Sequence, residues 1–90
     1  MSEFKIIGKL GGINKRNKYY MVDIAENKYN SEGEKINTIW YNCICAYKPR
    51  AKIGQLVIAT GSFVSSRNEN FPYALEINHI GVINEGGDNG

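Results

Sequence analysis

Apolar and polar residues alternate with a period of two along most of this 90-residue chain, and this pattern restricts its fold more than any other feature. Side chains two residues apart lie on the same face of a β-strand, so the pattern is typical of strands. No segment of useful length shows a helical repeat. The alternation predicts five strands, in the segments FKIIGKL (4–10), YYMVDIA (19–25), TIWYNCICAY (38–47), QLVIATGSFV (55–64) and YALEINHIGVI (73–83).

The segments between the predicted strands are rich in turn-forming residues: GGINKRN, NKYNSEGEK, KPRAKIG and SSRNENFP. Pro49 and Gly54 leave room for one short helical turn at most in the third of them. Short strands joined by such turns predict an all-β fold, a five-stranded antiparallel Greek-key barrel with little or no helix. We expect one domain over residues 1–83 and a flexible C-terminal tail over residues 84–90, since NEGGDNG has nothing to pack.

The only two cysteines, Cys43 and Cys45, fall on one face of the third strand, and the only tryptophan, Trp40, falls on the other. A structural zinc site needs about four nitrogen or sulfur ligands, and the chain adds only His79 to the two thiols. Free cysteine is often buried as a small hydrophobic residue. We therefore expect the cysteines in the core, no metal and no cofactor, and Trp40 pointing outward, although a half-buried Trp40 in the core is the ordinary alternative.

Positive charge is concentrated in the first two-thirds of the chain. Residues 1–60 carry ten Lys and Arg against five Asp and Glu, whereas residues 61–90 carry one against four. Aromatic residues alternate with these cations near the turns, and single-stranded nucleic acid needs flat side chains for its bases and cations for its phosphates. The predicted nucleic-acid-binding residues are Trp40, Tyr29, Tyr47, Tyr73, Phe71, Lys15, Arg16, Lys18, Lys48, Arg50 and Arg67.

The chain resembles the bacterial-type single-stranded DNA-binding proteins, whose domain is a five-stranded OB-fold barrel. The resemblance covers nearly all of residues 3–83. It depends on motifs that occur in the family's order: Gly-x-Leu-Gly at residues 8–11, Thr-x-Trp at residues 38–40, Gly54 with Val57 and Gly61, and Tyr73 with Glu76. The resemblance implies sequence-tolerant binding of single-stranded DNA in replication, recombination or repair.

Carried over by position, the resemblance makes Trp40 a base-stacking residue and places Tyr29 where the family often has an aromatic residue in its long hairpin. Tyr47 neighbours Ala46, which aligns with a further stacking position. The chain departs from the family in lacking room for the helix between the third and fourth strands. Because NEGGDNG has no Phe and no Asp cluster, we also do not expect the family's acidic tail, which recruits replication and repair enzymes. The chain thus resembles a shortened relative, for which such protein partners are an open question.

The sequence also bears on other functions. No nucleophile and base can be paired for an enzyme, and no recognition helix or zinc finger indicates binding to duplex DNA. An OB-fold protein-docking module of the primosome accessory type and a single-stranded RNA binder stay open as alternatives. With no secretory signal and no apolar stretch of membrane-spanning length, we expect a cytoplasmic protein without a membrane partner. Outward apolar residues predict a homodimer or homotetramer, with an interface that contains Ile7, Met21, Ile58 and Val64.

Overall fold

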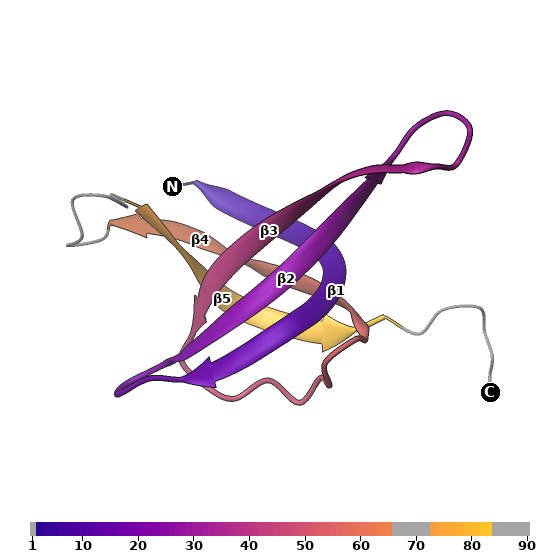
Figure 1. Ribbon diagram of the computed structural model, residues 1–90. Helices are drawn as coiled ribbons and strands as arrows, with labels where there is room; N and C mark the ends of the chain where they lie inside the picture. Colours follow the sequence, from indigo (N-terminus) through magenta and orange to yellow (C-terminus); the bar gives the residue numbers. More distant parts are fainter. Residues whose placement is uncertain (1, 66–72, 84–90) are drawn as a thin grey trace.

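The computed structural model describes residues 2–65 and 73–83, which form five strands and, over these ranges, no helix (Figure 1). The predicted all-β fold is confirmed. The strands are β1 (Glu3–Lys15), β2 (Tyr20–Tyr29), β3 (Lys35–Cys45), β4 (Leu56–Ser65) and β5 (Tyr73–Val82).

The five strands close into a barrel in the order β1-β2-β3-β5-β4. The long first strand closes it, because residues 3–9 pair with β4 and residues 9–15 pair with β2. Four of the five pairings are antiparallel, as predicted, whereas β3 and β5 pair in parallel over three residue pairs, so the sheet is mixed. A closed five-stranded barrel with this connectivity is consistent with an OB-fold.

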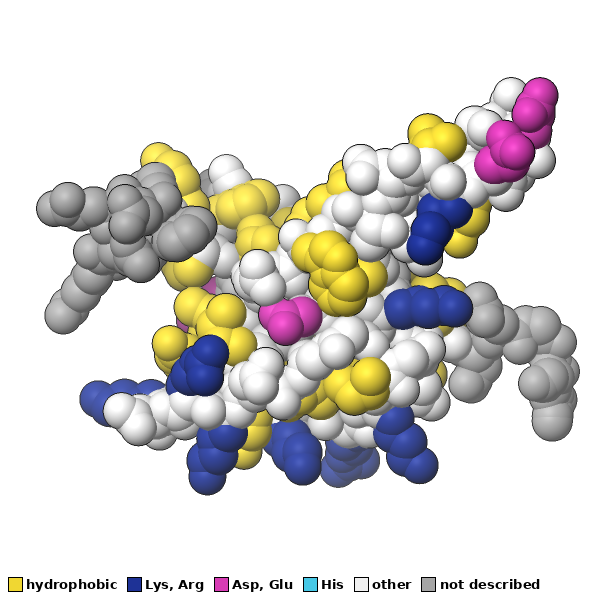
Figure 2. All heavy atoms as spheres, in the orientation of Figure 1, with side chains coloured by type: hydrophobic (Ala, Val, Ile, Leu, Met, Phe, Trp, Pro, Cys, Tyr) yellow, Lys and Arg dark blue, Asp and Glu magenta, His cyan; other side chains and the backbone are white. Residues whose placement is uncertain are grey.

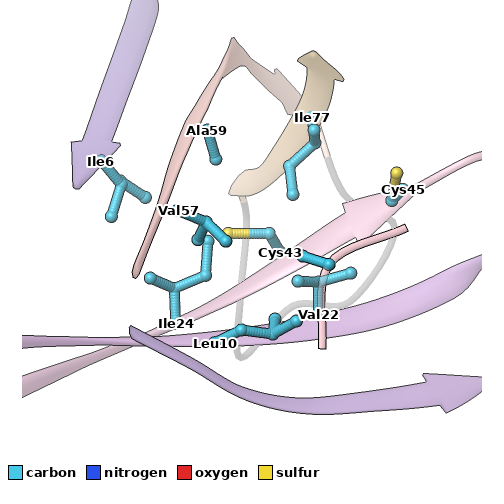
Figure 3. Packing of buried hydrophobic residues seen from close by; sticks show 10 residues of the cluster. Ile6, Leu10, Val22, Ile24, Cys43, Cys45, Val57, Ala59 and Ile77 are labelled. Carbon is cyan, nitrogen blue, oxygen red and sulfur yellow. The ribbon is translucent and has the colours of Figure 1, made fainter. Parts of the chain in front are cut away.

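The interior of the barrel is filled by the inward residues of every strand (Figure 3). Cys43 and Cys45 are fully buried and form no disulfide, which confirms that they pack as core residues. Burial raises the pKa of the Cys43 thiol to about 12. The buried hydrophobic residues are Ile6, Leu10, Val22, Ile24, Cys43, Cys45, Ala51, Val57, Ala59 and Ile77.

The connection between β3 and β4 covers the lower end of the barrel in Figure 1. Two of its residues, Pro49 and Ala51, are buried. Hydrogen bonds fix it to β1: the Leu10 amide donates to the Gln55 carbonyl at 2.9 Å, and the Gly54 amide donates to the Leu10 carbonyl at 2.7 Å. Gly54 has a φ of 94°, which glycine adopts without a steric penalty. A short segment of bends and one turn therefore caps the core without a helix.

The first predicted turn, GGINKRN, is mostly strand. β1 continues to Lys15, and the turn is confined to residues 16–19, where the Arg16 amide donates to the Tyr19 carbonyl at 2.8 Å. The glycines that suggested a turn instead form a bulge, since the pairing with β2 shifts register between Leu10 and Gly12. A bulge bends its strand and increases the twist. This bend lets β1 pass from β4 to β2.

Candidate nucleic-acid interface

The outer surface of β1, β2 and β3 carries the candidate site. Because Val22 and Ile24 point into the core, their neighbours on β2 point outward, and the register aligns these with outward residues of β3 and β1. One transverse row contains Lys9, Ala25 and Trp40. The adjacent row contains Gly12, Asp23 and Asn42, and the next contains Asn14, Met21 and Ile44.

Trp40 lies across this surface. A Cβ atom added at Gly11 would lie 2.5 Å from Cζ3 and 2.9 Å from Cη2 of the indole, so the far end of the ring rests on the β1 backbone. Since β2 lies between β3 and β1, the ring passes over β2 near the small residue Ala25, the register partner of Trp40. Trp40 is nevertheless 58% exposed and is not a core residue. The side chain forms a platform that is supported from below and open to solvent.

Hydrogen bonds between polar side chains hold the surface on both sides of this platform. Toward the β1–β2 turn, the Asn42 amide nitrogen donates to a carboxylate oxygen of Asp23 at 2.6 Å. Toward the hairpin tip, the Thr38 hydroxyl bonds the Asn27 side-chain oxygen at 2.8 Å. Each bond links β2 to β3. The strands that support Trp40 are thus fixed to each other by side chains as well as by the backbone ladder.

The described cations predicted to bind phosphate and the acidic residues at the tip of the β2–β3 hairpin lie at opposite ends of the β2–β3 ladder. Tyr20 pairs with Cys45, so the β1–β2 turn and the start of the β3–β4 connection lie at the same end. Figure 2 shows Lys and Arg gathered along the lower side of the molecule and acidic side chains at the tip of the β2–β3 hairpin. The described cations predicted to bind phosphate are all exposed at the lower end: Lys15, Arg16, Lys18, Lys48 and Arg50.

The structure places only one of the other predicted aromatic residues on the Trp40 surface. Tyr29, 59% exposed, follows Ala25 by four residues on β2, so the alternation of the strand gives both the same face. Tyr47 instead lines a groove of about 490 Å³ between the β3–β4 connection and β5, together with Lys48, Arg50 and His79. Tyr73 begins β5 beside Ser65 of β4. The four aromatic residues therefore form no single stacking surface.

Some predictions lie outside the described residues, namely Arg67, Phe71 and the tail over residues 84–90. Of the predicted oligomer interface, Ile7 and Ile58 are register partners on the outside of the barrel, and Val64 lies on the same face of β4. Met21 lies instead on β2, in the row that contains Asn14 and Ile44. The structure therefore does not bring Met21 next to the other three, because β2 does not pair with β4, and on β1 the partner of Met21 is Asn14 and not Ile7.

Sequence reasoning missed the residues that support the platform. Lys9 shares the Trp40 row, and Gly11 and Ala25 leave the space in which the indole lies. Alternation alone places Lys9 on the outside of β1, opposite Leu10. The sequence does not show that Lys9 aligns with Trp40, because the register of β1 against β2 depends on the bulge at Gly11.

No protein-family model and no curated protein matches this chain. Over residues 2–65 and 73–83, no helix is long and apolar enough to cross a membrane. In the same residues, no three His, Cys, Asp or Glu side chains are grouped so that they could hold a metal ion. The outer surface with Trp40 is therefore the candidate site on its geometry alone.

Proposed function

We propose that this protein binds single-stranded DNA by stacking bases on Trp40 and contacting phosphates with the basic residues at the lower end of the barrel. The observation that carries the proposal is the position of the indole, which lies over Ala25 and Gly11 and is 58% exposed. Burying an aromatic ring is favourable, so an exposed tryptophan held on a rigid sheet favours a flat partner. Stacking on such a ring accepts every base, because each has a π-face.

The charge distribution supports the same function. The exposed cations within residues 15–18 and 48–50 lie at the end of the ladder that Tyr20 and Cys45 form, and Lys9 adds a cation in the Trp40 row. A strand that passes over Trp40 toward this end would place its phosphates among these cations. Stacking is also tolerant of the sugar, so single-stranded RNA is a further ligand of the same site. We propose a role in replication, recombination or repair, in line with the resemblance to single-stranded DNA-binding proteins.

A fluorescence titration tests the proposal, because Trp40 is the only tryptophan and its emission reports the site directly. A mixed-sequence single strand should quench the emission, and a duplex of the same sequence should bind much more weakly. Removing a stacking platform costs about 1–3 kcal/mol, so Trp40→Ala should weaken binding about five- to hundredfold at low and at high salt. The loss is measured with a labelled oligonucleotide, since the variant has no tryptophan signal.

Two results would reject single-strand binding at this site. The first is unchanged emission and no binding of the labelled strand at low salt, and the alternative of a protein-docking module would then apply. The second is Trp40→Ala protein that melts at a lower temperature yet binds the strand like the parent. That result would show that the exposed ring contributes to folding only, and that any nucleic acid binds elsewhere on the barrel.

A further inference from the structure

A polar pair lies directly beside the platform. Asp23 is the register partner of Asn42, which is two residues from Trp40 on the same face of β3. Asp23 is therefore a diagonal neighbour of Trp40, and such neighbours are about 7–8 Å apart, which long or aromatic groups can span. Asp23 is partly exposed and Asn42 is exposed, so a ligand can reach both side chains. A base that stacks on Trp40 and extends toward the basic end would meet this pair with its edge.

The hydrogen bond between the two side chains fixes what the pair offers to a ligand. A carboxylate only accepts hydrogen bonds, so the Asn42 amide must turn its nitrogen toward Asp23, as the 2.6 Å contact shows. The amide oxygen then faces away. Among the described residues, neither this oxygen nor the second carboxylate oxygen of Asp23 has a hydrogen-bond partner. The pair therefore offers a ligand two hydrogen-bond acceptors, the amide oxygen of Asn42 and a charged carboxylate oxygen of Asp23. It offers only one donor, the remaining N–H of the Asn42 amide.

The negative charge also determines which part of a strand can lie there. Asp23 lies between the Trp40 row and the basic end of the ladder, and a phosphate beside a carboxylate is repelled. A base edge that donates hydrogen bonds is attracted, and hydrogen bonds to a charged acceptor are about twice as strong as neutral ones. Cytosine and adenine offer one amino group on their pairing edge, and guanine offers an N–H and an amino group side by side. Thymine and uracil offer a single N–H between two carbonyl oxygens, which a carboxylate repels.

We propose that Asp23, held by Asn42, makes the site prefer amino-bearing bases over thymine and uracil at the nucleotide that stacks on Trp40. This inference rests on the proposed function, since it requires a base on Trp40. Binding then tolerates sequence along the rest of the strand and discriminates at one position. A well-formed contact to a base edge discriminates by about 1–3 kcal/mol, which corresponds to a factor of about five or more in affinity.

The test compares oligo(dC) with oligo(dU), both of about 12 nucleotides, within the site sizes of OB-folds. The two bases have the same ring size, and the amino group of cytosine replaces a carbonyl of uracil. At pH 8, where cytosine is unprotonated, the parent should bind oligo(dC) at least about fivefold more tightly. Asp23→Asn should bring the ratio of the two dissociation constants close to one, because the second amide presents a donor where the carboxylate accepted.

A matched charge variant separates this effect from general electrostatics. Glu3→Gln removes one exposed carboxylate from the part of β1 that pairs with β4, away from the Trp40 row. It should raise both affinities slightly and leave their ratio unchanged. Should Asp23→Asn fail to fold, a strand of 2-pyrimidinone, which carries hydrogen in place of the amino group, tests the parent itself. It should bind about as weakly as oligo(dU).

Three results would overturn the inference: equal affinity of the parent for both strands, an unchanged ratio in Asp23→Asn, or tight binding of the 2-pyrimidinone strand. Each of these requires that the protein binds single strands, so each would reject base discrimination and leave the proposed function intact. If the parent binds neither strand at low salt, the proposed function fails, and base discrimination at Trp40 fails with it.

Discussion

Gly11→Ala adds one carbon atom beneath the indole and tests the platform more directly than removing Trp40. The new Cβ would lie 2.5 Å from Cζ3 of the ring, whereas carbon atoms in contact are about 3.5–4.0 Å apart, so the ring must move by about 1 Å or more. Gly11 does not have a positive φ, so alanine fits its backbone. We expect a change in tryptophan emission and a loss of affinity of up to about hundredfold, the limit set by one stacked base at about 1–3 kcal/mol.

The free energy of unfolding should change little, because alanine at an unstrained glycine position restricts the unfolded chain by about 0.4–1 kcal/mol and offsets part of the lost packing. Gly81→Ala is the matched control, since its Cβ would meet His79 at 3.6 Å, an ordinary contact on β5. In a Trp40→Ala background, Gly11→Ala should cost no further affinity. Parent-like emission and affinity in the single variant Gly11→Ala would refute the geometry of the platform, because the ring could not then rest where the structure places it.

Four further predictions follow from the rest of the molecule. Lys48→Ala should reduce the slope of log affinity against log salt by about 0.7, with the larger loss of affinity at low salt. Alkylation at pH 8 should leave the native thiols unmodified and label both in denaturant, because both side chains are fully buried and burial also raises the pKa of Cys43 to about 12. The Tyr41 hydroxyl donates to Glu26 and lowers the pKa of that carboxyl below its ordinary value of 4.5. The stability that this hydrogen bond contributes at neutral pH should therefore fall as the pH drops below about 4.5. Melting curves of Tyr41→Phe should show a smaller fall over the same pH range. Ile58→Lys should lower the mass found by light scattering if the proposed homo-oligomer uses the outer face of β4.

The faces of the strands could be predicted from alternation, and the structure agrees with them. Ile6 and Leu10 are buried, as are both cysteines, and Trp40 is exposed. What alternation could not give is how the strands align. A bulge shifts the register of every later pair, and the bulge in β1 occurs at glycines that equally suggest a turn. The parallel pairing of β3 with β5 depends on closure of the whole barrel, which no local pattern encodes.

The same limit applies to the candidate site: the sequence predicts which of its residues point outward but not which of them lie side by side. Alternation predicts that Trp40 points outward, and the structure exposes both Trp40 and the basic residues at positions 15–18 and 48–50. Tyr47 is predicted as a further stacking residue because it follows Trp40 on the same segment and neighbours Ala46, which aligns with a stacking position. In the structure β3 ends at Cys45, and Tyr47 lines a groove with His79 of β5. Proximity in sequence failed here because the chain leaves the sheet before it reaches the aromatic residue.

The distance between Trp40 and the cations at the basic end suggests that stacking and charge contribute to binding in different ways. Trp40 pairs with Ala25, five residues along the ladder from Tyr20 and Cys45, which at about 3.3 Å per residue puts roughly 16 Å between the platform and the basic end. This exceeds the Debye length of about 8 Å at physiological salt, so these cations act weakly on a phosphate above Trp40. Stacking and the polar edge at Asp23 would then determine how a base is held, whereas the basic end would determine how fast and at what salt concentration a strand is captured. A single barrel can in this way keep a carboxylate beside its stacking residue and still attract a polyanion.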